Sequence, residues 1–137
     1  MPTFNLQIVT PEREVFNGPV EAVKLPGLEG SFGVLADHAP MIAALEAGPL
    51  EITDAQGQRM RLAVGGGFFQ VANDVAMVLA DSAEFAADIN VERATASESR
   101  ARSRLAGEID PGFVLQRDRA EAALKRARAR LRVAGGR

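Results

Sequence analysis

The chain has 137 residues, of which 47% are hydrophobic and 25% charged, and it contains no cysteine and a single histidine. This length supports one domain with a buried core, or a compact domain with a small appendage. The composition excludes disulfides, thiolate metal sites, cysteine nucleophiles and histidine-rich metal sites. No signal peptide is recognised, and no window approaches the roughly 20 apolar residues of a membrane span. We expect a soluble, cytosolic protein that can sit on a membrane complex.

Charge divides the sequence into two parts. Residues 1–84 carry 4 Lys/Arg against 11 Asp/Glu, a net charge of −7, whereas residues 85–137 carry 12 against 7, a net charge of +5. Glycine and proline follow the same division, with 9 of 13 glycines and 6 of 7 prolines before residue 85. We therefore predict two domains, at 1–84 and at 85–137.

The first part has the pattern of short strands separated by turns. Apolar and polar residues alternate from Phe4 to Val9, and a strand containing Val15-Phe16 is predicted to end at the turn dipeptide Asn17-Gly18. Further strands are predicted over 20–25, 50–53, 60–64, 68–72 and 75–79, with hairpin turns at 54–57 and 73–74. Many short strands without a helical period indicate an antiparallel β sandwich or barrel.

Two glycine clusters interrupt the strands. Glycines recur every third residue in LPGLEGSFGVLADHAP, residues 25–40, and Gly65-Gly66-Gly67 precedes two phenylalanines. Neither cluster fits a nucleotide-binding loop, because the first lacks the G-x-G-x-x-G spacing and the second lacks a following Lys-Ser/Thr. Glycines in such places predict a bulge, a sharp bend, or a backbone that lies close to another surface.

From residue 90 the apolar period becomes helical. Asn90 is predicted to cap a helix that ends at Gly107, and Asp110-Pro111-Gly112 is predicted to form a turn. The apolar faces hold Val91, Ala94, Ala101 and Leu105 in the first helix, and Phe113, Ala120, Ala123, Leu124, Ala127, Leu131 and Ala134 in the second. A short link between amphipathic helices predicts an antiparallel hairpin.

This hairpin has a thin core. Each buried alanine methyl contributes roughly 0.8 kcal/mol at best, whereas ordering the backbone of one residue costs roughly 1–2 kcal/mol. We expect the hairpin to lean on the β domain or on a partner. Such a weakly docked helix pair also permits a switch between two states.

The sequence offers few combinations of residues that could form a catalytic site. A Ser-His-Asp triad would have to use His38, which lies beside Asp37, and no serine occupies a G-x-S-x-G turn. A histidine that bonds to the backbone or touches a partner is the simpler interpretation. A small hydrolase that uses His38 is a remote alternative.

The arginine-rich second part suggests another alternative, a free-standing β-sandwich module whose basic helical arm binds RNA or another polyanion. Proteins that bind single-stranded nucleic acid usually alternate aromatic side chains, on which bases stack, with basic ones. That pattern is missing in the second part, where Phe85 and Phe113 are the aromatic residues. The arginines would equally suit a solvated helix face or an acidic protein surface.

Several segments, in order, resemble the epsilon subunit of the F-type, rotary, proton-translocating ATP synthase. They are TFNLQIVTPEREVFNG, PGLEGSFGVLADHAP, VGGGFFQV, VAMVLADSA, ADINVERA and AALKRARARLRV, and they span nearly the whole chain. The resemblance implies an N-terminal antiparallel β sandwich followed by a two-helix antiparallel hairpin. It implies a non-catalytic rotor subunit, peripheral on the cytoplasmic face of the bacterial plasma membrane, that couples proton transport to ATP synthesis.

The resemblance also implies partners. The sandwich would bind the gamma subunit and the ring of c subunits through Glu29, Gly30, Ser31, His38, Ala39, Pro40 and Met41. The hairpin would act as a regulatory arm that reaches the catalytic beta subunits and restrains ATP hydrolysis. Its basic residues Arg126, Arg128 and Arg130 would then meet acidic segments of those subunits. No nucleic acid and no cofactor is expected.

Some members of the family bind ATP through an I/L-D-x-x-R-A motif. Here Ile89 to Ala94 reads INVERA, so Asn90 replaces the aspartate, while Arg93 remains as the residue that would contact a phosphate. The departure argues against nucleotide binding. Arg93 is equally consistent with an ordinary residue on a helix surface.

Overall fold

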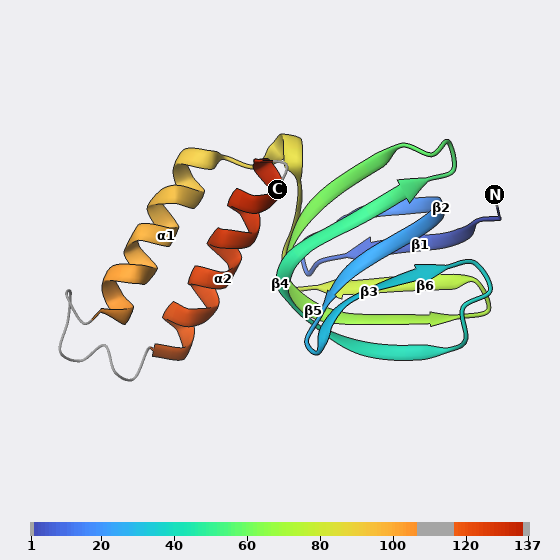
Figure 1. Ribbon diagram of the computed structural model, residues 1–137, viewed down its shortest axis with the longest axis horizontal. Coiled ribbons are helices and arrows are strands. Elements are labelled where there is room, and N and C mark those ends of the chain that lie inside the picture. The colour runs from blue at the N-terminus through green and yellow to red at the C-terminus, as the bar shows by residue number, and fades with distance from the viewer. Residues whose placement is uncertain (1, 107–116, 136–137) are drawn as a thin grey trace.

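The computed structural model describes residues 2–106 and 117–135 (Figure 1). Its elements are β1 (Phe4–Val9), β2 (Glu14–Gly27), β3 (Gly30–Leu35), β4 (Met41–Asp54), β5 (Arg59–Ala72), β6 (Val75–Ala80), β7 (Ala83–Phe85), the 3₁₀ helix η1 (Ala86–Asp88), α1 (Val91–Leu105) and α2 (Arg117–Ala134). The strands form a β sandwich, and the two helices run antiparallel with α2 between the sandwich and α1 (Figure 1). The predicted fold class is therefore confirmed. The predicted helix end at Gly107, the turn at 110–112 and Phe113 lie outside the described residues.

The sheet closes on itself. Its strand order is β1-β6-β5-β4-β2-β3, β1 pairs with β2 as well, and β7 pairs with β5. The prediction of purely antiparallel pairing is wrong in one place, because β1 runs parallel to β6. The closed ring β1-β6-β5-β4-β2 has an odd number of strands, so strand directions cannot alternate all the way round, and one neighbouring pair must be parallel.

Three strands of 14 residues, β2, β4 and β5, pass through both layers of the sandwich. The predicted turn at Asn17-Gly18 is therefore wrong, since both residues lie inside β2 and pair with β1. The chain reverses earlier, where the Thr10 amide donates to the Arg13 carbonyl at 2.9 Å. Pairing along β1 outweighs the local turn preference of that dipeptide.

The predicted hairpin turns at 54–57 and 73–74 are confirmed. Asn73 and Asp74 have φ angles of 52° and 59°, as a tight two-residue hairpin requires. The predicted strands 60–64 and 68–72 are, however, the two halves of β5, which bends at the glycine triplet 65–67.

The bend in β5 explains the triplet. Gly67 has φ 142°, and a Cβ there would overlap the Leu79 carbonyl oxygen and lie 2.9 Å from the Cα of Ala80. The Gly65 amide donates to the Ser82 carbonyl at 2.9 Å, so the bend also directs the chain from β6 to β7. The interpretation of the triplet as a strand bend is confirmed.

The core lies between the layers. Its largest fully buried side chains are Phe69, Leu6, Ile8, Leu25, Leu50, Ile52, Leu62, Val20, Val23, Val34, Val64 and Val78. Phe32 meets Phe69 edge to face, with ring centroids 5.8 Å apart. The closed ring and this core make the sandwich a rigid base for the groups on its surface.

The hairpin leans on the sandwich, as its thin core predicted. Asn90 caps α1, its side-chain oxygen accepting from the Arg93 amide at 2.9 Å. The sequence did not reveal a second apolar face on α2, where Ala129 and Val133 pack against Ala63 of β5. Ala86 and Ile89 also pack against this cluster, and the contact is small.

Candidate functional site

The predicted contact residues Glu29, Gly30, Ser31 and Met41 line one groove. It has a volume of about 580 Å³ and runs between the β2–β3 turn, β3 and the start of β4. Gly30 has φ 129°, and nothing lies within 4 Å of the position that a Cβ would take. Glycine is thus required there by the backbone conformation, and the space above it is open.

The other predicted contact residues, His38, Ala39 and Pro40, lie in the β3–β4 connection, at the far end of β3 from Glu29. His38 shares a hydrogen bond with the Ala39 carbonyl, Nδ1 to O 2.6 Å. Within the described residues it bonds to no serine and no carboxylate, so no catalytic triad forms there. The structure therefore favours the simpler interpretation of this histidine.

An exposed apolar face adjoins the groove, and sequence analysis did not single it out. We define the apolar face as Ile42, Phe68, Val75 and Leu79, which are 76%, 59%, 56% and 48% exposed. Phe68 and Leu79 are cross-strand partners, and the register of β4, β5 and β6 directs all four side chains outward from one layer. Gln70 lies opposite Ile42 on the same face, and exposed large apolar side chains that gather in this way mark a site of association with another protein.

Basic residues of α2 form ion pairs with the sandwich and with α1. Arg130 Nε donates to Glu84 Oε1 of β7 at 2.5 Å, and Arg128 Nε lies 3.6 Å from Glu98 of α1. Lys125 lies 4.0 Å from Glu46 of β4. These groups are partly exposed, so each pair contributes on the order of 0–1 kcal/mol.

Arg126 docks differently. Its Cδ lies 3.2 Å from the position of a Cβ on Gly65, so the missing side chain of that glycine leaves room for the arginine stem. The three predicted arm residues thus contact β5, α1 and β7 in this state of the molecule.

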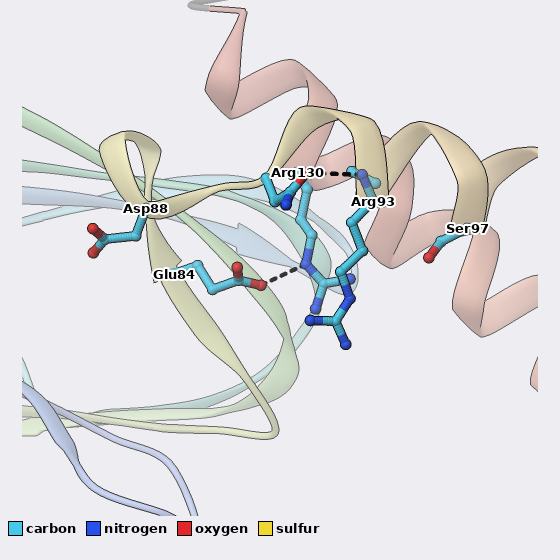
Figure 2. A pocket seen from close by; sticks show the side chains of 7 residues that line it. Glu84, Asp88, Arg93, Ser97 and Arg130 are labelled. Carbon is cyan, nitrogen blue, oxygen red and sulfur yellow. Dashed lines mark hydrogen bonds and ion pairs between the residues drawn. The ribbon is translucent and has the colours of Figure 1, made fainter.

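Arg93 lies in a pocket of about 360 Å³ where β7, the start of α1 and α2 meet. Figure 2 shows the guanidinium groups of Arg93 and Arg130 side by side in this pocket, with Glu84 bonded to Arg130. Asp88 also lines the pocket, but Figure 2 shows its carboxylate pointing away from both arginines. Glu84 is the labelled carboxylate that points toward the two cations, so an anion would compete with Glu84 for Arg130.

Family models match both parts of the chain. The ATP synthase Delta/Epsilon chain β-sandwich domain matches residues 3–86, and the long α-helix domain of the same chain matches residues 87–135. The chain belongs to the ATP synthase Delta/Epsilon chain family. Among the described residues, no helix is long and apolar enough to cross a membrane.

Relatives and solved structures agree with this assignment. The ATP synthase epsilon chain of Moorella thermoacetica is 44% identical over 98% of both chains, and that of Symbiobacterium thermophilum is 46% identical over 98% of this chain and 95% of its own. A chain of the Euglena gracilis mitochondrial ATP synthase shares the fold, with a TM-score of 0.79 at 24% identity, covering 94% of this chain and 80% of that one. A chain from the Tetrahymena thermophila ATP synthase central stalk and c-ring structure has a TM-score of 0.56 at 13% identity, covering 96% and 93%.

This family membership fixes the broad role. The chain is a non-catalytic subunit of an ATP synthase, a membrane-associated complex. The predicted family and function are confirmed at this level.

Proposed function

We propose that residues 1–84 attach the subunit to the rotor and that residues 85–137 form its regulatory arm. The sandwich would bind the gamma subunit and the ring of c subunits on the cytoplasmic face of the bacterial plasma membrane, and so couple proton transport to ATP synthesis. The observation that carries this proposal is the apolar face, which adjoins the groove lined by Glu29, Gly30, Ser31 and Met41. A closed, well-packed ring of strands suits a part that transmits torque, because it resists shear.

The arm is suited to a second state. Its contact with the sandwich consists of small apolar side chains and partly exposed ion pairs, so the docked and released states can differ by only a few kcal/mol. On release, Arg126 and Arg130 would lose their contacts with the sandwich and join Arg128, which is paired within the arm, as a basic surface for the catalytic beta subunits. In the described part of the arm, Arg128 and Arg130 are paired with carboxylates of the same chain, which argues against the alternative polyanion binder.

Removing the arm tests its regulatory role. Deletion of residues 89–137 is expected to raise the ATP hydrolysis rate of the assembled complex about fivefold or more, a typical size for coupling between sites. The rate should be compared with that of the complex carrying the full chain at equal occupancy. An unchanged rate would show that the arm has a structural role only.

A single charge change tests how the arm is held. Glu84→Gln removes the charge that Arg130 meets at 2.5 Å, and we expect the ratio of docked to released arm to fall by up to about fivefold, since an exposed pair contributes up to about 1 kcal/mol. A pair of fluorescent labels on Leu35 and Ser99 reports the distance between sandwich and arm. Glu21→Gln is the matched control, because Glu21 has no hydrogen bond or ion pair within the described residues. Equal behaviour of the two variants would contradict the role of the Glu84–Arg130 pair.

A further inference from the structure

The outer edge of β3 is an unprotected strand edge. Within the described residues β3 pairs with β2 alone, whereas every strand of the closed ring has neighbours on both sides. Natural proteins protect such edges with charged residues, proline, bulges or very short strands. The sequence of β3, GSFGVL, has no charge and no proline, and its six residues pair with β2 without a register shift. The other edge strand, β7, has only three residues.

The register shows which backbone groups are free. Gly27 and Gly30 form the hydrogen-bonded pair that closes the tight turn before β3. Hydrogen-bonded and non-hydrogen-bonded pairs alternate along an antiparallel ladder, so Ser31, Gly33 and Leu35 belong to non-hydrogen-bonded pairs. The backbone N–H and C=O groups of Ser31, Gly33 and Leu35 therefore point away from β2. Leu35 is also 60% exposed.

The groove beside this edge can take side chains. Phe32, Met41, Ile42 and Ala43 line it, and Glu29 is the one charged residue among its lining residues in the described part of the chain. An extended segment added to a sheet edge gains affinity from main-chain hydrogen bonds and specificity from pockets for alternate side chains. An edge and a groove together provide both.

We propose that β3 takes up an extended strand from a neighbouring chain of the ATP synthase, with apolar side chains in the groove and a lysine or arginine opposite Glu29. The inference rests on the proposed attachment of the sandwich to the rotor and specifies that the attachment includes an added β-strand. Charge supports this occupant over a second copy of the same chain, because residues 1–84 carry a net charge of −7 and two such domains repel each other. Six residues of β3 give a contact about 20 Å long.

Hydrogen exchange tests the added strand directly. The amides of Ser31, Gly33 and Leu35 should exchange at least about tenfold more slowly in the purified ATP synthase than in the isolated full chain, because a partner strand accepts from them. Equal exchange rates in the two samples would overturn the proposal. Slow exchange in the isolated chain, accompanied by a dimer in sedimentation, would also overturn it in favour of self-association.

A pair of variants separates backbone from side-chain effects. Ser31→Pro removes one outward amide, which an edge strand tolerates, and should lower the affinity for the rest of the complex about fivefold, the effect of one net hydrogen bond. Ser31→Val keeps the amide and should bind more tightly than Ser31→Pro, because the two variants both change the side chain and differ in the backbone donor. Equal binding of both variants would contradict the strand addition but leave the proposed rotor attachment intact. Failure of the wild-type chain to assemble with the complex would contradict both the strand addition and the rotor attachment. If Ser31→Pro does not fold, the exchange measurement still decides.

Discussion

Replacing Gly67 by alanine is expected to destabilise the sandwich by about 3 kcal/mol or more, since it combines a left-handed backbone with a severe overlap. The residue has φ 142°, and the added Cβ would overlap the carbonyl oxygen of Leu79, which belongs to the paired strand β6. Backbone atoms held in a ladder cannot move aside without breaking the pairing of β5 with β6. A loss of this size is a large share of the roughly 5–15 kcal/mol that stabilises a typical domain.

The same substitution at Gly65 is the matched control. Gly65 does not have a positive φ, and the added methyl would meet the ends of two side chains, the Ser82 hydroxyl and the Arg126 stem. We expect Gly65→Ala to keep the sandwich folded and to loosen the arm. Thermal unfolding should show a drop of roughly 15 °C for Gly67→Ala and little change for Gly65→Ala. Similar melting temperatures for both variants would contradict this account of the bend.

Replacing Phe68 by aspartate is expected to weaken assembly of the subunit with the rotor about 30-fold or more, since a buried aromatic at an interface centre contributes about 2 kcal/mol or more. The ring lies in the apolar face beside Leu79 and is 59% exposed in the isolated chain. The substitution therefore leaves the core untouched. In the complex it would place an unpaired charge in an apolar contact.

Titration of the subunit into ATP synthase stripped of it measures this effect. Val91→Asp is the control, because Val91 is a large apolar residue of similar exposure, 51%, at the start of α1 and away from the apolar face. Thermal unfolding of both variants should match that of the wild type. If Phe68→Asp bound with the affinity of the wild type, the apolar face would not be part of the contact with the rotor.

Local patterns predicted the elements that local geometry determines. The alternation in Phe4–Val9 gives β1, the dipeptide Asn73-Asp74 gives the β5–β6 turn, and Asn90 caps α1. The long strands were not predicted, because the sequence does not show whether a glycine or a turn dipeptide ends a strand or bends it. Pairing with distant strands decides that, as at Asn17 in β2.

The candidate site was predictable only in part. The resemblance pointed to Glu29–Ser31 and Met41, which the fold brings to one groove, but it gave no reason for His38 to lie at the other end of β3. The apolar face escaped notice because Phe68 and Phe69 look alike in the sequence, although one is exposed and the other fully buried. Only the register of the sheet distinguishes them.

The small contact beneath the arm has a thermal consequence. Ala63, Ala129 and Val133 bury few apolar atoms, so releasing the arm exposes little surface of the type that changes heat capacity. The enthalpy of releasing the arm should therefore stay nearly constant with temperature. Dissolved electrolyte screens the carboxylate–guanidinium attractions between arm and sandwich and lowers the docked fraction. The arm is thus built to respond to the ionic surroundings of the enzyme.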